Sequence, residues 1–135
     1  MENYFSPVLS DDQIRNVSSL GLAHVGDAAY ELLVRTWLCE QGKETGRGFH
    51  QAAIALVRAE AQSEGAARIR PRLTDDELAV FRRGRNAHPH TIPPHATRAQ
   101  YADATALEAL FGWLYLTGRQ ARANELFRVI MDADK

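Results

Sequence analysis

The chain has 135 residues, a net charge of −1, and 45% hydrophobic and 24% charged residues. This composition is typical of a globular domain and argues against a disordered tail protein; polar residues also interrupt each apolar run well before it could span a bilayer. The length suits one domain, residues 1–135, which would bury roughly two-thirds of the surface of its unfolded chain.

The first residues of the chain are polar and acidic. They lack the basic leader and the apolar stretch of a secretory signal, so we expect a cytoplasmic location. Ser10 and Gln13 have capping-box spacing, in which two side chains bind the free backbone N–H groups at a helix start. A short helical turn can therefore precede the longer helices.

Apolar residues recur every three or four positions in the rest of the chain, with no sustained alternation of the kind that marks a strand. We therefore predict an all-α fold, a helical bundle. Capping boxes and stop residues delimit its helices: Thr74 with Glu77, Thr97 with Gln100, Gly42, Pro71 and Gly118. The expected helices cover residues 18–41, 48–69, 74–86, 98–117 and 119–131. The proline-rich loop from residue 87 to 97 is the one irregular segment long enough to be a functional loop.

An acidic residue stands inside the first long apolar run, residues 20–38. Burying an unpaired carboxylate costs several kcal/mol, on the order of the ion-desolvation penalty, so Asp27 must face solvent, meet a cation or meet a metal. Asp27, Glu31 and Arg35 are spaced by four and could form a solvated salt-bridge ladder. The opposite face is expected to be the apolar one: Leu22, Val25, Ala29, Leu33 and Trp37.

Gly26 favours a different interpretation of Asp27. Glycine inside a helix costs about 1 kcal/mol relative to alanine, so its presence suggests that another backbone passes close by. The later run, residues 106–118, repeats this pattern with Glu108 and Gly112. Two carboxylates at such a crossing would repel unless a divalent cation, Mg²⁺ or Mn²⁺, lay between them. Pairing of Glu108 with an arginine remains an alternative, with Arg35 or Arg119 as the partner.

Between residues 68 and 98 the chain has seven arginines and only three acids, so one face could be basic. The cluster Arg82, Arg83 and Arg85 could meet phosphates, with Gly84 letting the chain turn so that the three do not share one helical face. The alternative is a solvated helix end with cations at its favourable C-terminus. The lone Cys39 excludes a disulfide framework and is expected to pack in the core.

Several motifs resemble the ribonuclease III family. Gly26-Asp27-Ala28, followed by the apolar run AYELLV, matches the signature helix of that family, and Glu108 followed by Ala-Leu and a glycine matches a later helix. The match is closest to the minimal branch, Mini-ribonuclease III, which has the catalytic domain and lacks the double-stranded-RNA-binding domain. Residues 79–87, 91–96 and 106–118 extend the resemblance over nearly the whole chain.

The resemblance implies an endoribonuclease that cleaves double-stranded RNA with Mg²⁺, for which Mn²⁺ can substitute. Asp27 and Glu108 would be its catalytic residues and metal ligands, and maturation of the 23S ribosomal RNA precursor would be its role. The expected RNA contacts lie in the basic segment and at one helix start: Arg82, Arg83, Arg85, Asn86 and His50. Phosphate contacts of this kind position a protein without specifying sequence.

This chain departs from the larger family members at two positions. Those members carry further acids four residues before the aspartate and three before the glutamate, where this chain has Ala23 and Thr105. Only Asp27 and Glu108 therefore remain as direct acidic ligands. His24 stands where tyrosine is more usual in the minimal branch, and we expect a packed or surface histidine there rather than a ligand.

The resemblance also implies a homodimer, because a monomer of this size could hardly place two sites across a duplex. Gly21, Ala28 and Ala29 are small enough for close helix approach, whereas Trp37 and Trp113 are expected in the core more than at an interface. Two other functions stay open: a non-catalytic helical dimer that binds double-stranded RNA, and a helical interaction module unrelated to RNA.

Overall fold

The computed structural model describes residues 1–42, 47–87 and 96–132. Its helices are α1 (Asp11–Arg15), α2 (Ser19–Glu40), α3 (Arg47–Val57), α4 (Ala59–Ile69), α5 (Asp75–Arg85), α6 (Arg98–Leu116) and α7 (Gln120–Asp132), with a 3-10 turn, η1 (Arg70–Arg72). Within these ranges the structure has no strand beyond one isolated bridge between Val8 and Thr117, which confirms the all-α prediction. No helix in these ranges is long and apolar enough to cross a membrane.

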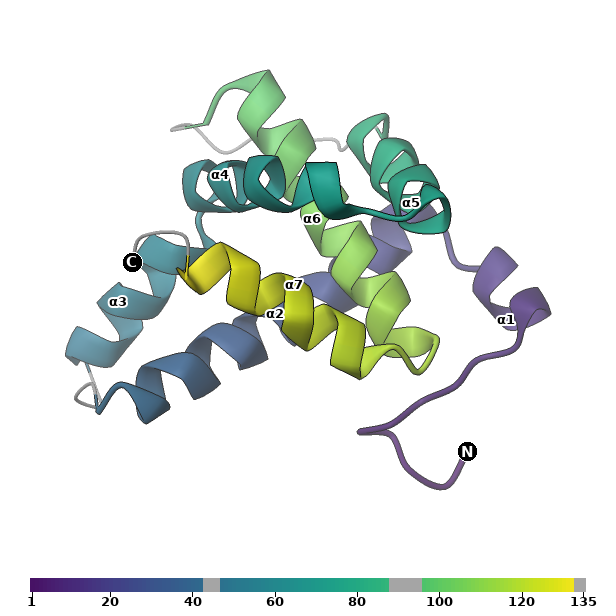
Figure 1. The fold of residues 1–135 in the computed structure, drawn as a ribbon, viewed down its shortest axis with the longest axis horizontal. Coiled ribbons are helices and arrows are strands. Elements are labelled where there is room, and N and C mark those ends of the chain that lie inside the picture. The colour runs from purple at the N-terminus through teal and green to yellow at the C-terminus, as the bar shows by residue number, and fades with distance from the viewer. Residues whose placement is uncertain (43–46, 88–95, 133–135) are drawn as a thin grey trace.

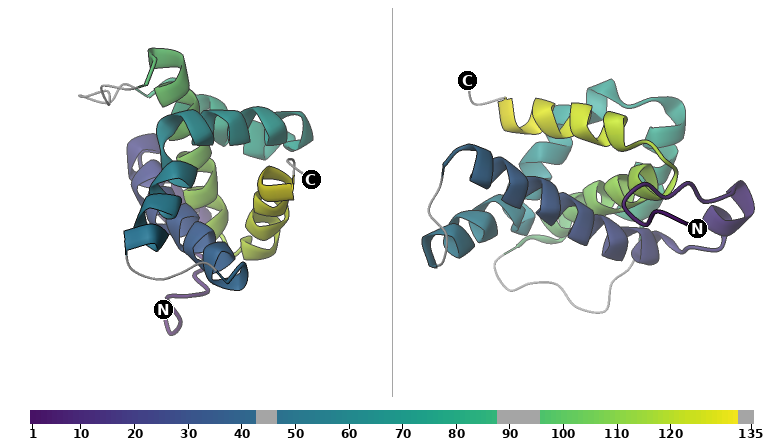
Figure 2. Two further views of the ribbon diagram at one scale, coloured as in Figure 1. Left: turned by 90° about the vertical axis from the view of Figure 1, so that its left-hand side faces the viewer. Right: turned by 90° about the horizontal axis from the view of Figure 1, so that it is seen from below.

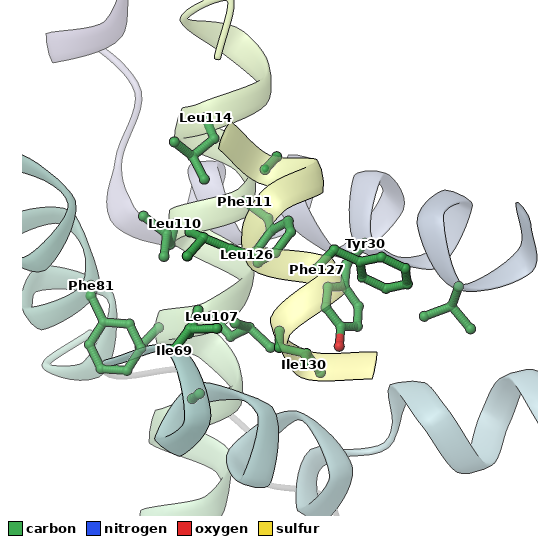
Figure 3. Packing of buried hydrophobic residues seen from close by; sticks show 14 of the residues in the cluster. Tyr30, Ile69, Phe81, Leu107, Leu110, Phe111, Leu114, Leu126, Phe127 and Ile130 are labelled. Carbon is green, nitrogen blue, oxygen red and sulfur yellow. The ribbon is translucent and has the colours of Figure 1, made fainter. Parts of the chain in front are cut away.

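Helix α6 is the centre of the fold, because α2, α4, α5 and α7 all pack against it (Figures 1 and 2). Its buried side chains meet those of α7 and α2 in one continuous core (Figure 3). Tyr30 of α2 is 1% exposed there and makes edge-on contacts with Phe111 and Phe127, at 5.2 and 5.7 Å between ring centroids. Both tryptophans are half-buried against this core, as expected.

The helix prediction is right at most positions and wrong at one. Capping boxes form at Ser10, Thr74 and Thr97, and the short α1 follows the first of them. The single helix expected over residues 48–69 is instead two helices, because Arg58 has the extended backbone of an N-cap (ψ 159°) and starts α4. Of the expected loop 87–97, residues 88–95 lie outside the described ranges.

Two glycines let α2 and α6 cross in direct backbone contact. A Cβ atom at Gly26 would overlap the carbonyl oxygen of Glu108 and lie 2.7 Å from the backbone nitrogen of Gly112. A Cβ atom at Gly112 would in turn overlap the carbonyl oxygen of Leu22. The prediction that another backbone passes close to Gly26 is therefore confirmed, and the two helical turns that carry Asp27 and Glu108 lie at the crossing.

This crossing also corrects the face of α2 that was expected to be apolar. The buried side of α2 runs through Gly26 and Tyr30, whereas Val25, Ala29, Leu33 and Trp37 are only half-buried. The cause is the close approach at Gly26, which turns that residue, rather than Val25, toward α6. Cys39 is exposed, so the expectation of a buried thiol is wrong.

Gly84 has a different role from the one expected. It lies within α5, where a Cβ atom would approach the Ala109 side chain to 2.8 Å and the Ala106 Cα to 3.0 Å. It therefore allows α5 to pack closely on α6 and does not turn the chain. Helix α5 is tied to α7 as well, since Arg122 donates to both carboxylate oxygens of the buried Glu77, at 2.8 and 2.9 Å.

Candidate active site

The structure brings Asp27 and Glu108 together at the crossing of α2 and α6. Asp27 is exposed, and Glu108 is half-buried within hydrogen-bonding reach of it. Glu108 also lies within hydrogen-bonding reach of the side chain of Gln62, which comes from α4 and is 2% exposed. Three helices thus supply one site, in which one carboxylate faces solvent and the other is set back toward the core.

The two carboxylates cannot both be charged at low cost. Burial first, and the neighbouring Asp27 carboxylate second, raise the pKa of Glu108 to about 8, against the opposing effect of the Gln62 hydrogen bond. A like charge nearby and a low-dielectric surrounding both disfavour the ionised form. At neutral pH Glu108 therefore keeps a proton unless a cation takes its place.

The arginine pairings considered for these acids do not form. Arg35 donates to Glu31 at 2.6 Å, and Arg119 lies over the ring of Trp113 at 4.6 Å from its centroid. Across the described ranges no ion pair involves Asp27 or Glu108. The salt-bridge ladder through Asp27 and the arginine partner for Glu108 are therefore wrong for this structure.

The donor set at the crossing fits a magnesium ion. Two carboxylates close together, one of them desolvated and without a cation, provide oxygen ligands and a charge that a divalent ion would neutralise. Mg²⁺ keeps several of its waters, so two protein ligands with an open side toward solvent suit it. No group of three or more acidic, histidine or cysteine side chains that could hold a metal occurs in the described residues.

The residues at the two positions where larger family members carry acids cannot serve as acidic metal ligands in this chain. Ala23 is 7% exposed and packs in the apolar cluster with Leu22, Val80 and Ala109. Thr105 is buried, and its hydroxyl donates to the backbone oxygen of Tyr101 at 2.9 Å. Neither residue supplements the two carboxylates.

The expected RNA-binding residues are divided between two helices. Arg82 and Arg83 are exposed on the last turn of α5, and the exposed Asn86 is its C-cap. Arg85 donates through its Nε to Asp103 of α6 at 2.8 Å, and its side chain remains 37% exposed. His50 is exposed on α3, apart from this cluster.

Glu108 should make the stability of the metal-free protein depend on pH. Its pKa is 4.5 ordinarily and about 8 in the fold, so between these values the native state holds a proton that the unfolded chain has lost. Raising the pH through this window therefore lowers the free energy of unfolding. Urea titrations with EDTA should show this decline in the wild type and a flatter profile in Glu108→Gln. Equal slopes for the two proteins would contradict the burial of this carboxyl group.

Sequence reasoning missed one member of the site. Gln62 stands at a helical spacing from the buried Gly65, Ala66 and Ile69, so an amide occupies a position on the apolar stripe of α4. The place of Gln62 on this apolar stripe could have identified it as a site residue, because a buried polar side chain needs a hydrogen-bond partner. The single helix expected over residues 48–69 did not predict that Gln62 would contact Glu108.

Comparison with known proteins identifies the family of this chain. The family model of the Ribonuclease III domain matches residues 20–119. Mini-ribonuclease 3 of Symbiobacterium thermophilum is 42% identical over 113 residues, which make up 84% of this chain and 87% of the relative. Mini-ribonuclease 3 of Clostridium tetani is 32% identical over 134 residues, or 98% and 89% of the two chains.

A solved structure is similar over nearly the same length. The crystal structure of a protein from Fusobacterium nucleatum superposes with a TM-score of 0.82 at 28% identity, covering 91% of this chain and 98% of that one. The fold, the order of the motifs and the identity to several relatives lead to the same assignment. The chain belongs to the Mini-ribonuclease 3 branch of the ribonuclease III family and is a ribonuclease III-type endoribonuclease.

Proposed function

We propose that this protein cleaves double-stranded RNA with Mg²⁺ held by Asp27 and Glu108. The observation that carries the proposal is the pair of carboxylates that two glycines bring together at the crossing of α2 and α6. A cation is the partner that this pair lacks among the described residues. The membership of the ribonuclease III family supports duplex RNA as the substrate.

Asp27 and Glu108 would contribute the negative charge that holds the ion, and the helix crossing would fix their positions. When bound, Mg²⁺ supplies an activated water and stabilises the charge that grows on the phosphate and on the leaving oxygen. Asp27, on the exposed side, leaves the site open to a phosphate from solvent. Glu108 is held from the protein side, so its carboxylate keeps one orientation. The rigid backbone contact at Gly26 fixes the spacing between the two.

The basic end of α5 is the RNA-binding surface in this proposal. Arg82, Arg83 and Asn86 are exposed there, next to α6, which carries Glu108. Arg85 holds α5 on α6 through Asp103 and offers its exposed edge to a phosphate. His50 would contact the duplex from α3. A-form RNA is recognised mainly by its backbone and 2′-hydroxyl groups, which suits a cluster of cations.

Replacing both Arg82 and Arg83 by alanine should weaken binding to duplex RNA uniformly across sequences. Two lost phosphate contacts should also reduce the slope of log affinity against log salt by about 1.8, at roughly 0.9 per contact for a duplex. Binding measured between 50 and 200 mM salt in Ca²⁺ checks this. Arg15→Ala, in an exposed pair with Asp12 on α1, serves as the control. Unchanged affinity and slope in the double variant would favour an interaction module unrelated to RNA.

We further propose that two copies form the active enzyme. An apolar hollow of about 520 Å³ is lined by residues of α2, α6 and α7 and by Phe5. Its lining includes Phe5, which is 81% exposed, and Leu32, which is 58% exposed, together with Val25, Ala28, Ala29, Leu33, Phe111 and Ala123. Contiguous apolar surface of this kind marks an interaction site. A two-fold pairing over this face would bury it on both copies.

Leu32→Asp should convert the dimer to a monomer, since each copy would bring an unpaired charge into the apolar contact. Light scattering coupled to size-exclusion chromatography measures the mass directly. Ile54→Asp, at another exposed apolar position on α3, is the matched control and should leave the mass unchanged. A wild-type protein with the mass of one chain would contradict the dimer.

The 23S ribosomal RNA precursor is the substrate that we propose. The test incubates the protein with a double-stranded RNA that contains the structured precursor end, with Mg²⁺ or with EDTA. Cleavage in Mg²⁺ alone is the expected result. Binding to this RNA without cleavage in Mg²⁺ would favour the alternative, a non-catalytic dimer that binds double-stranded RNA.

A further inference from the structure

Gln62 is one of the few polar side chains in the core. It is 2% exposed and lies on α4, which packs directly on α6. Its neighbours on the same side of α4, Gly65 and Ala66, are buried as well. Burying an amide without partners costs about 1–3 kcal/mol, so a glutamine at this depth is expected to make hydrogen bonds. Among the described residues no buried side-chain nitrogen or oxygen lacks a partner.

The side chain of Gln62 lies within hydrogen-bonding reach of Glu108. This contact lowers the pKa of Glu108, so it stabilises the ionised carboxylate, which can only accept hydrogen bonds; the Gln62 amide N–H group is therefore the donor. Gln62 reaches Glu108 from α4, whereas Asp27 reaches it from α2. Glu108 is thus held between a neutral donor on one side and the second carboxylate on the other.

We propose that Gln62 is a positioning residue of the metal site: its buried amide holds the Glu108 carboxylate in the orientation that binds the ion. The proposal rests on the proposed role of Glu108 as a ligand. Ligating carboxylates are themselves commonly hydrogen-bonded, and losing such an outer partner costs typically 10- to 100-fold in metal affinity or activity. Gln62 would not contact the metal and would act through Glu108.

The test replaces Gln62 by methionine, which keeps the length and approximate volume of the side chain and removes the amide. Isothermal titration with Mn²⁺ should show affinity reduced about tenfold. The Mg²⁺ concentration for half-maximal RNA cleavage should rise by the same factor. At saturating Mg²⁺ the cleavage rate should return to within about threefold of the wild type, with the KM for RNA unchanged. A thermal melt of each variant in EDTA checks the fold separately, because excess metal also stabilises the folded state.

Ser63→Ala is the matched control. Ser63 is the next residue of α4 and donates from its hydroxyl to Asp103 of α6 at 3.3 Å, so this variant loosens the same helix pair without touching Glu108. Its Mn²⁺ affinity should stay within about twofold of the wild type. If Gln62→Met does not fold, Gln62→Asn keeps an amide but withdraws it by one methylene, and the same loss of Mn²⁺ affinity is expected.

The outcomes separate this inference from the proposed function. If Glu108→Gln abolishes Mn²⁺ binding while the Gln62 variants bind it as the wild type does, the positioning role is wrong and the ligand assignment stands. If Glu108→Gln binds Mn²⁺ and cleaves RNA normally, the ligand assignment itself is wrong, and the positioning role fails with it. Equal losses in Ser63→Ala and Gln62→Met would also contradict the inference, since the effect would then come from helix packing.

Discussion

Asp27→Asn should abolish RNA cleavage, with a loss of at least about 10³-fold, and leave the fold intact. A bound metal supplies several kcal/mol of transition-state stabilisation, and each 1.36 kcal/mol corresponds to tenfold in rate. Asparagine keeps the size of the side chain but removes the charge that holds the ion. Because Asp27 is exposed, the change removes no core packing. Single-turnover cleavage of duplex RNA in Mg²⁺ measures the effect.

Glu31→Gln is the matched control for this variant. Glu31 lies one turn later on the same face of α2 and pairs with Arg35, an interaction between exposed groups that contributes at most about 1 kcal/mol. Its cleavage rate should stay within about threefold of the wild type. Equal rates for the wild type and Asp27→Asn would remove Asp27 from the site and favour the non-catalytic alternative.

Among the glycines that the structure describes, Gly26 should be the one at which alanine is most destabilising. The added Cβ atom would overlap the Glu108 carbonyl oxygen, and backbone cannot move aside as the end of a flexible side chain can. We expect a loss of more than about 3 kcal/mol in the free energy of unfolding, at the upper end of overpacking effects. Cleavage should fall as well, because separating α2 from α6 separates the two carboxylates. Urea titration measures the change in the free energy of unfolding.

Gly48→Ala tests the same substitution where space is open. Gly48 lies in α3 with no atom within 4 Å of an added Cβ, so alanine should stabilise that helix by about 0.5–1 kcal/mol through its higher helix propensity. The free energy of unfolding should therefore fall in Gly26→Ala and rise in Gly48→Ala. Similar stability of Gly26→Ala and the wild type would mean that the two backbones are not in contact.

Local signals allowed much of the fold to be predicted from the sequence. The capping boxes at Ser10, Thr74 and Thr97 formed because each hydroxyl binds a backbone N–H group three residues later, which spacing alone reveals. The cost of glycine inside a helix likewise points from Gly26 to a backbone crossing. The same pattern at Glu108 and Gly112 indicates that the two carboxylates could converge there.

Features that depend on tertiary contact could not be predicted in this way. The break at Arg58 has neither proline nor glycine, so nothing local distinguishes it from the interior of a helix. The buried side of α2 is set by the approach of α6 at Gly26, which shifts it away from Val25. Gln62 meets Glu108 only because α4 is a separate helix that packs on α6. Each of these features needs the position of a second element.

The most direct test of the two-carboxylate site is a crystal structure of the protein soaked with Mn²⁺. We expect an anomalous difference peak at the crossing of α2 and α6, bound directly to a carboxylate oxygen of Asp27 or Glu108 or bridged to them by water. Its remaining ligands should be waters on the side of Asp27. A peak bound elsewhere, or none at the crossing in a protein that cleaves duplex RNA with Mn²⁺, would contradict the assignment.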